Sequence, residues 1–357
     1  MKRKPVTVRI LKTHYPQWGR HTAFNACLRH FDSRAFNISM KDVPMGDGKL
    51  IPASFSRFFL KRLRRNKIQE YGGNDFWAEG HMFGRALLQK IDVIHFIDAE
   101  HSLLFLPGWF RKFGFIKAFP KIVAMFHQPP AILEKIIDKE IAGLADRILT
   151  VAPDQADFFS RFVPVERIST IRLGVDTEHF KPLSAKKDPE KFRCLGGGVW
   201  LRDYRAFFET AKRLAGIPEI EFHIVAPALE IPASAKNIVF HRGISDAALL
   251  ELYQNSHVLF LPLKDATANT FLLEGCACGL PIVSTDLPST HVYFPGEEAI
   301  LIKDNDPLAF AKALTDLYRD PHKQWWMSQC ARERALQFSW KKIVREYERM
   351  YRNLVGA

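Results

Sequence analysis

The stretch VLFLPLKDATANTFLLEGCACGLPIVSTD, residues 258–286, decides the fold. It reads as a buried strand (VLFLPL), a polar loop (KDATAN), a helix (TFLLEGCACG) and a second buried strand (PIVSTD). Short apolar strands joined through a helix are typical of a parallel sheet. A single acid in the helix, Glu274, lies among small residues. It is either an ordinary exposed helix residue or a group that binds something.

The same alternation of strands and helices extends through the whole chain. The predicted strands are 6–11, 93–97, 121–126, 147–151, 168–174, 193–198, 221–227, 238–243, 258–263, 281–286 and 299–302. The predicted helices of the second half are 203–215, 246–255, 270–278, 307–319, 322–337 and 340–354. We interpret the charged, proline-containing segment 176–192 as a linker. We therefore predict an α/β protein of two doubly wound domains that face each other, with ligands beyond the carboxyl ends of the strands, in the cleft.

Composition and charge narrow the class of protein. The chain has 357 residues, of which 47% are hydrophobic and 25% charged, so it can build cores and is not disordered. Residues 1–180 contain 28 basic and 18 acidic side chains, a net +10. The remaining 23 basic and 21 acidic side chains give +2, which completes the net charge of +12. A basic first half indicates an anionic partner, such as a membrane surface, a phosphate-bearing substrate or nucleic acid. Nucleic acid is the least favoured of the three, because the sequence contains no recognition motif for it.

The cysteines and the N-terminus indicate where the protein works. The five cysteines show no CxxC pair and no zinc spacing, which favours reduced thiols in the cytoplasm. Asp-x-Asp is absent and the histidines are scattered, so no metal site is expected. The basic N-terminus lacks the apolar core of a signal peptide, and no run approaches the roughly 20 apolar residues of a spanning helix. We predict a cytoplasmic protein, soluble or peripheral on the inner face of the cytoplasmic membrane.

Two basic, aromatic segments of the first half suit such a surface. They are SFSRFFLKRLRRNK (54–67) and FLPGWFRKFGFIKAFPK (105–121). Basic amphipathic segments with aromatic residues bind interfaces of anionic lipid. The alternative is a stripe that faces the core and a solvated basic face.

The helix within 258–286 offers a binding site. Asn269 is expected to cap this helix, with Thr270 at its start. Free N–H groups at a helix N-terminus favour phosphate. Glu274 lies about one turn further along, near enough to accept hydrogen bonds from a ribose. The alternative is a plain strand–loop–helix unit with a solvated glutamate.

The stretch LEGCACGLPIVSTD (273–286) resembles the nucleotide-sugar site of GT-B glycosyltransferases, especially the retaining enzymes of family 4 (glycosyl transferases group 1). Other similar stretches follow in the family's order: ADRILTVAPDQADFF (145–159), IRLGVDTEHFKP (171–182), HRGISDAALLELYQNSHVLFLP (241–262) and FSWKKIVREYERMYRNL (338–354). The resemblance implies two Rossmann-like domains facing across a cleft. It assigns 1–180 to an acceptor-binding domain, 181–337 to a nucleotide-sugar-binding domain and 338–357 to a helix that returns to the first domain.

The resemblance also implies roles for residues of the second domain. Glu274 matches the second acid of the family's pair, which holds the nucleotide ribose. The position of the first acid falls on Ala266, one place from Asp265. We expect Asp265, Asn269 and Thr270 to bind the sugar or the donor phosphates instead.

The loop GGGVWLRDYRAF (196–207) stands where the family binds the donor diphosphate with an Arg and a Lys. Arg202 stands at the Lys position and can contact phosphate through two N–H groups. The Arg position falls on Gly197, and Arg205 is expected to compensate. The alternative, a surface arginine, is disfavoured because a helix N-terminus repels cations.

The first domain supplies fewer matches. His127, just past a predicted strand, stands where the family's histidine approaches the transferred sugar; the alternative is a loop histidine packed on prolines. Gly19 would let the backbone approach the donor phosphates, unless it is a simple turn glycine. Asp98, Glu100 or His101 is expected to touch the acceptor.

The sequence thus predicts a cytoplasmic glycosyltransferase in cell-surface polysaccharide or lipopolysaccharide assembly. It would move a sugar from a UDP- or GDP-linked donor to a glycan or lipid-linked acceptor, with retention and without a metal, a cofactor or nucleic acid. One alternative is a catalytically silent scaffold on the same fold, which the unmatched Glu and Arg favour. The others are a nucleotide-sugar epimerase and a phosphorylase, although no lysine has the context that pyridoxal phosphate needs.

Overall fold

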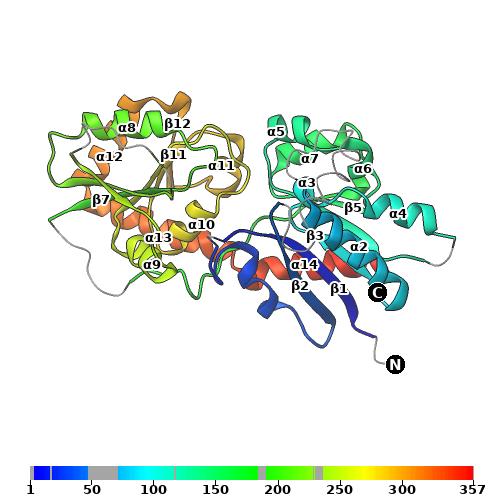
Figure 1. Ribbon diagram of the computed structural model, residues 1–357. Coiled ribbons are helices and arrows are strands. Elements are labelled where there is room, and N and C mark those ends of the chain that lie inside the picture. The colour runs from blue at the N-terminus through cyan, green and yellow to red at the C-terminus, as the bar shows by residue number, and fades with distance from the viewer. Residues whose placement is uncertain are drawn as a thin grey trace. The chain divides into compact units, whose positions relative to one another are not determined.

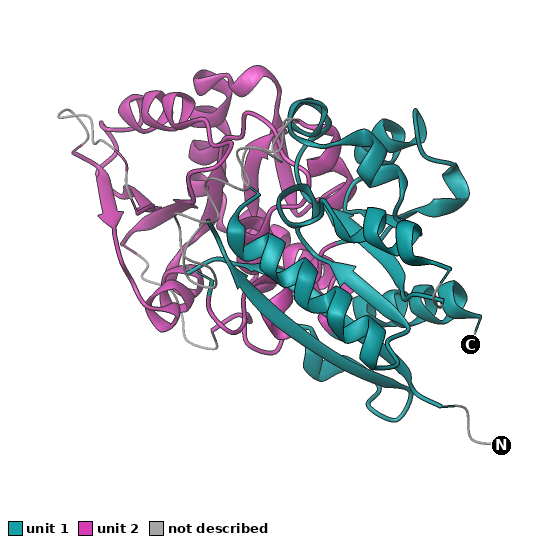
Figure 2. Ribbon diagram, turned by 45° about the vertical axis from the view of Figure 1, so that its right-hand side comes forward, with its two compact units in different colours: residues 1–18, 27–172, 341–357 teal, residues 19–26, 173–340 magenta. Residues whose placement is uncertain are grey.

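The structure, a computed structural model, describes residues 4–16, 18–46, 71–115, 118–183, 190–227, 229 and 236–356. The chain divides into two compact units (Figure 2). Unit 1 comprises residues 1–18, 27–172 and 341–357, and unit 2 comprises residues 19–26 and 173–340. These ranges differ somewhat from the predicted boundaries at 180 and 337, which stay predictions. The segment 54–67 lies outside the described residues.

Unit 1 is built on a six-stranded parallel sheet in the order β2-β1-β3-β4-β5-β6 (Figure 1). Its strands are β1 (Val6–His14), β2 (Phe36–Pro44), β3 (Val93–Phe96), β4 (Lys121–Phe126), β5 (Arg147–Thr150) and β6 (Ile168–Thr170). Its helices include α2 (Gly73–Leu88), α3 (Ala99–Ser102), α4 (Leu106–Phe113), α5 (Pro130–Ile136), α6 (Lys139–Gly143) and α7 (Pro153–Ser160). Every residue of β3 is buried, as expected of a central strand covered on both faces.

The C-terminal helix α14 (Trp340–Val355) packs on unit 1, as the sequence predicts. Tyr351 is fully buried, and a hydrogen bond of 2.6 Å joins its hydroxyl to Nδ1 of His95 in β3. The backbone N–H of Asp32 donates to the carboxylate of Glu348. Aromatic burial and these two polar contacts therefore fix the helix against the sheet.

Unit 2 has a second six-stranded parallel sheet, in the order β12-β11-β10-β7-β8-β9. Its strands are β7 (Phe192–Gly197), β8 (Ile220–Val225), β9 (Ile238–His241), β10 (Val258–Leu261), β11 (Ile282–Thr285) and β12 (Ala299–Ile302). Its helices include α8 (Tyr204–Arg213), α9 (Asp246–Asn255), α10 (Thr270–Ala277), α11 (Pro288–Tyr293), α12 (Pro307–Arg319) and α13 (Pro321–Gln337). The α/β class and the two doubly wound sheets are confirmed.

Strand order places a topological switch point in unit 2. The chain runs from β7 to β8 and β9 on one side, then returns to β10, β11 and β12 on the other. The direction of winding therefore reverses between β7 and β10, and ligands of such sheets bind at this switch point. The predicted site residues of 196–207 and 265–274 follow these two strands. No helix among the described residues is long and apolar enough to cross a membrane.

Candidate functional site

The loops after β7 and β10 are tied together by backbone hydrogen bonds. The N–H of Asp203 donates to Pro262 O, and that of Lys264 donates to Leu201 O, both at 2.9 Å. Leu201 has a positive φ of 57°, an unfavourable conformation for a branched side chain. Two crossed backbone contacts hold this strained residue at the switch point, where strain is often kept for function.

Arg202 lies at the centre of these loops. Its Nε donates to Gly197 O and its Nη1 to Trp200 O, each at 2.9 Å. Both acceptors are neutral carbonyls, and among the described residues no ion pair joins Arg202 to an acid. Burial lowers the pKa of Arg202 to about 10, so the guanidinium remains charged at neutral pH. The loop therefore holds a fixed, uncompensated positive charge, which suits a phosphate.

Gly197 leaves no room for an arginine, the residue that the resemblance leads us to expect there. A Cβ built on Gly197 would lie 2.4 Å from Cε2 of Phe271 in α10. The close approach of strand and helix thus explains physically why a residue without a side chain stands at this position. Arg205, the predicted substitute, is exposed in the first turn of α8, and the described residues show no ion pair for it.

We expect Gly197→Ala to lower the free energy of unfolding by about 1–3 kcal/mol, because the new methyl group must displace the Phe271 ring. Chemical denaturation of both proteins measures the difference. Gly216→Ala is the matched control, since a Cβ there meets nothing within 4 Å. Equal free energies of unfolding for the two variants would show that the strand–helix contact accommodates the methyl group without loss of stability.

The helix α10 begins as the sequence predicts. The Asn269 side chain accepts a hydrogen bond from the N–H of Leu272 and caps the helix. Thr270 is the first helical residue and is half-buried. Asp265 turns its carboxylate to its own loop, where Oδ1 accepts from the N–H of Ala266 at 2.8 Å. Burial raises the pKa of Asp265, and Ala266, at the position expected for the family's first acid, is buried and carries no acid.

Glu274 is 3% exposed, so the alternative of a solvated glutamate is wrong. Its Oε2 accepts a hydrogen bond of 3.0 Å from the hydroxyl of Tyr253 in α9. Its Oε1 is buried and has no hydrogen-bond partner among the described residues. Burial raises the pKa of Glu274 to about 8 despite the hydrogen bond from Tyr253, which lowers it. A buried acceptor without a partner is unusual in proteins and is typical of a site that a ligand completes.

Gly19 lies in unit 2 close to Asp246, the first residue of α9. A Cβ at position 19 would come within 1.6 Å of the Asp246 carboxylate, so close packing requires glycine there. Its carbonyl accepts a hydrogen bond from the Asn25 side chain. A neighbouring carboxylate disfavours a phosphate, and this geometry favours the packing role of Gly19 over the predicted approach of its backbone to the donor.

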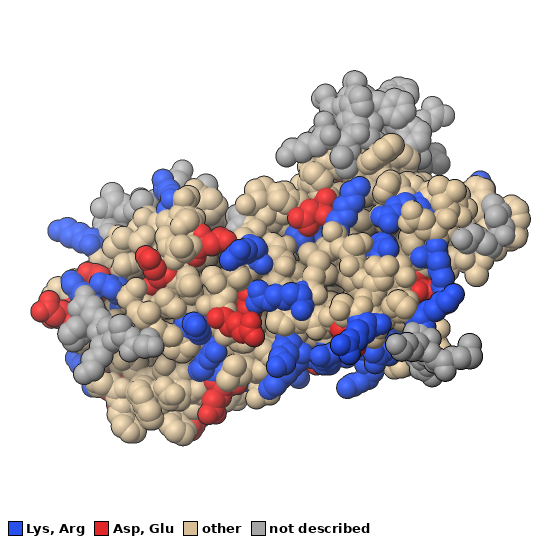
Figure 3. Space-filling view, turned by 90° about the horizontal axis from the view of Figure 1, so that it is seen from below, with Lys and Arg blue, Asp and Glu red and all other residues tan. Residues whose placement is uncertain are grey.

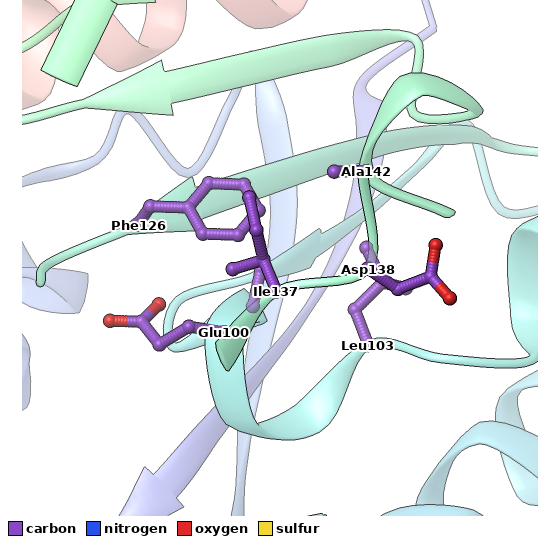
Figure 4. Close-up of a pocket in the computed structure, with 7 residues that line it drawn as sticks. Glu100, Leu103, Phe126, Ile137, Asp138 and Ala142 are labelled. Carbon is purple, nitrogen blue, oxygen red and sulfur yellow. The ribbon is translucent and has the colours of Figure 1, made fainter. Parts of the chain in front are cut away.

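His127 and Glu100 lie together at the carboxyl edge of the unit 1 sheet. The N–H of His127 donates to Oε1 of Glu100 at 2.9 Å. Glu100 is 2% exposed, its Oε2 has no partner among the described residues, and burial raises its pKa. It borders a small, mainly apolar pocket with Phe126 and Ile137, and its carboxylate points away from the Ile137 side chain (Figure 4). The described residues contain no group of three or more acids, histidines or cysteines arranged to hold a metal.

Asp98 and His101 flank this pair. Oδ2 of Asp98 accepts from the N–H of Thr13 at 2.9 Å, so this carboxylate fixes the end of β1. His101 is half-buried, and its charge lowers the pKa of Glu100 against the larger effect of burial. Of the three residues expected at the acceptor, Glu100 alone carries a buried carboxylate oxygen without a partner among the described residues.

Comparison with known proteins identifies this architecture. Residues 194–320, which contain both site loops, match the family model "Glycosyl transferases group 1". In this part the chain is similar to the glycosyl transferases group 1. The predicted enzyme class, a glycosyltransferase, is thereby confirmed. The finer placement in family 4 stays a prediction.

The curated relatives are distant. D-inositol 3-phosphate glycosyltransferase of Corynebacterium urealyticum is 24% identical over 312 residues, which are 78% of this chain and 70% of the relative. The enzyme of that name from Paenarthrobacter aurescens is 25% identical over 62% of this chain and 60% of the relative. This chain thus spans less than two thirds of the latter.

Solved glycosyltransferases share the fold over the full chain. Sucrose-phosphate synthase from Thermosynechococcus elongatus superposes with a TM-score of 0.72 at 15% identity, covering 99% of this chain and 100% of its own. Anabaena Alr3699/HepE, solved with UDP, gives a TM-score of 0.68 at 12% identity, covering 98% and 100%. At such identities the likeness shows the GT-B fold alone.

Proposed function

We propose that this glycosyltransferase moves a sugar from a nucleotide-sugar donor to a glycan or lipid-linked acceptor, with retention and without a metal ion. One observation carries the proposal: unit 2 presents a fixed, uncompensated Arg202 and a buried Glu274 with an open oxygen, Oε1, after the two strands that flank its switch point. A cation for the diphosphate and an acceptor for hydroxyl groups are what a nucleotide sugar requires.

The donor is bound by residues of unit 2. Glu274 holds the ribose, while Arg202, with Arg205, holds the diphosphate. Asn269, Thr270 and Asp265 border the phosphates or the sugar. The donor is UDP- or GDP-linked, and UDP is tried first because HepE, which shares the fold, was solved with UDP and with UDP-glucose.

Catalysis rests on stabilising the leaving group. The bond between the sugar and the diphosphate breaks, a bond to the acceptor hydroxyl oxygen forms, and the hydroxyl proton passes to the departing diphosphate. Arg202 offsets the charge that develops on that diphosphate, a preorganised electrostatic effect. His127, fixed through its backbone by Glu100, contacts the transferred sugar.

The acceptor belongs to the basic unit 1. The α14 face that turns to solvent is strongly basic, and lysine and arginine side chains gather over this helix (Figure 3). The exposed basic residues of α14 are Lys341, Lys342, Arg345, Arg349 and Arg352. Phe115, next to α4, is 84% exposed beside the exposed Arg111 and Lys112. Such a surface suits an anionic membrane, and we propose that the enzyme works there on lipid-linked precursors of cell-surface polysaccharide or lipopolysaccharide.

Release of nucleotide diphosphate tests the proposal against a silent scaffold. The full chain is incubated with UDP-glucose, UDP-galactose, GDP-mannose or ADP-glucose, with and without a lipid extract of bacterial membranes. We expect release from one donor, stimulated by the extract, and loss of release in Arg202→Ala. Turnover of no donor would favour the scaffold, and a changed sugar on an intact nucleotide would favour an epimerase.

A further inference from the structure

Tyr253 is a fully buried residue of α9 for which the sequence predicts no role. Its ring packs against Phe271, with centroids 5.0 Å apart, and against Phe180 at 5.9 Å. Its hydroxyl donates a hydrogen bond of 3.0 Å to Oε2 of Glu274. These ring contacts hold the tyrosine ring, and its hydrogen bond in turn fixes where that carboxylate oxygen lies.

The two oxygens of Glu274 are therefore not equivalent. Oε2 has a buried partner, whereas Oε1 is buried and has none among the described residues. An unsatisfied carboxylate oxygen is costly in a protein interior, and a rotation that satisfied Oε1 would take Oε2 away from Tyr253. The hydrogen bond from Tyr253 thus holds the carboxylate in an orientation that leaves Oε1 buried and unsatisfied, at a cost in free energy.

We propose that Tyr253 is a positioning residue that fixes Glu274 with Oε1 free for a ribose hydroxyl, and that it thereby gives the site its preference for ribonucleotides over deoxyribonucleotides. The inference rests on the proposed function, because it assumes that a nucleotide occupies this site. A site built to accept a hydroxyl group rejects the analogue that lacks it, since its polar atom then stays unpaired. Rejection of the deoxy analogue therefore requires a carboxylate whose orientation is fixed.

The charges around Glu274 also predict that ribonucleotide affinity depends on pH. Burial raises the pKa of Glu274 most, the hydrogen bond from Tyr253 and the nearby Thr22 side chain lower it, and the Asp246 carboxylate raises it. Arg202 and Cys278 face Tyr253 itself. A hydroxyl donor binds the carboxylate more strongly than the carboxylic acid, so ribonucleotide affinity should rise as pH increases through about 8. Removing the Tyr253 hydroxyl takes away a contact that lowers this pKa, so the rise should move to higher pH.

The test compares Tyr253→Phe with wild type by calorimetry of UDP, 2′-deoxy-UDP and 3′-deoxy-UDP between pH 7 and 10, with the corresponding guanosine compounds used if the protein binds GDP. We expect wild type to prefer UDP by about tenfold or more over at least one deoxy analogue, as for a hydrogen bond to a charged group. In Tyr253→Phe the preference should fall to within about threefold and the pH midpoint should rise. Tyr318→Phe is the matched control, a tyrosine that packs on the core of unit 2 beside Phe192.

The outcomes are distinct. A Tyr253→Phe variant that keeps both the preference and the pH profile overturns the positioning role, even if Glu274→Gln has lost UDP binding. A wild-type protein that binds neither UDP nor GDP overturns the proposed function and this inference together. Phenylalanine keeps the ring packing, and a circular dichroism melt confirms that the variant is folded. If it is not, Tyr253→His, which offers an N–H, is expected to restore part of the preference, and failure to do so counts against the proposal.

Discussion

Replacing Glu274 by glutamine is expected to weaken nucleotide binding by about 10- to 100-fold above pH 8. The amide has the same shape but lacks the charge, and a hydrogen bond to a charged acceptor is worth about 1.5–3 kcal/mol. The loss should be smaller at pH 7, where a glutamate of pKa about 8 is already mostly protonated in the free protein. Calorimetric titration with UDP and GDP at pH 7 and 9 measures the change.

The same substitution has a predictable effect on stability. The folded pKa of Glu274 lies above the ordinary value of 4.5, so the folded state binds more protons than the unfolded state between these two pH values. Because of this residue, the free energy of unfolding should fall as pH rises from about 4.5 to 8. Glu274→Gln should abolish this part of the pH dependence of stability. Glu251→Gln on the exposed face of α9 serves as the control. Unchanged nucleotide affinity in Glu274→Gln at pH 9 would contradict the ribose role.

Arg202→Ala is expected to lower the rate of sugar transfer by about 10²–10³-fold, the usual cost of removing one preorganised charge donor. The variant loses the charge and also the hydrogen bonds to Gly197 and Trp200 that shape the loop. Arg202→Lys should recover part of the rate, because it restores charge without the planar fork. The turnover number at saturating donor is the quantity to measure.

Arg213→Ala, at the far end of α8 on an exposed position, is the matched control and should leave turnover unchanged. Arg205→Ala tests whether the exposed arginine also stabilises the leaving group. If it does, the Arg202→Ala/Arg205→Ala double variant should have a lower turnover number than Arg202→Ala. An Arg202→Ala enzyme with turnover within twofold of wild type is incompatible with the proposed stabilisation of the leaving group.

The sequence was most informative where apolar periodicity is strong. The predicted helix 307–319 matches α12, because a helix covering a sheet must repeat its apolar face. The predicted helix 246–255 matches α9 as well, although Tyr253 is its one buried residue. Strand β2 was not predicted. It lies at the edge of the unit 1 sheet and reads FNISMKDVP, in which exposed and half-buried polar residues break the apolar run. An edge strand with solvent on one side does not need that run.

The site was predictable in its residues and not in their contacts. A motif locates Glu274, yet nothing in the spacing of Tyr253 and Glu274, which are 21 residues apart on different helices, indicates a hydrogen bond. The same holds for the pairing of Glu100 with His127. Such contacts follow from helix placement on the sheet, which local sequence does not encode. Gly197 illustrates the reverse: the sequence showed a missing arginine, and only the structure supplies Phe271 as the reason.

The most direct test of a nucleotide-sugar site in unit 2 is amide hydrogen exchange of the full chain with and without UDP-glucose, repeated with GDP-mannose. Backbone amides that a ligand covers or steadies exchange more slowly. We expect protection in two segments, 198–203 and 269–275, that follow β7 and β10. Protection in neither segment with either donor, or protection confined to other parts of the chain, would contradict a nucleotide-sugar site there.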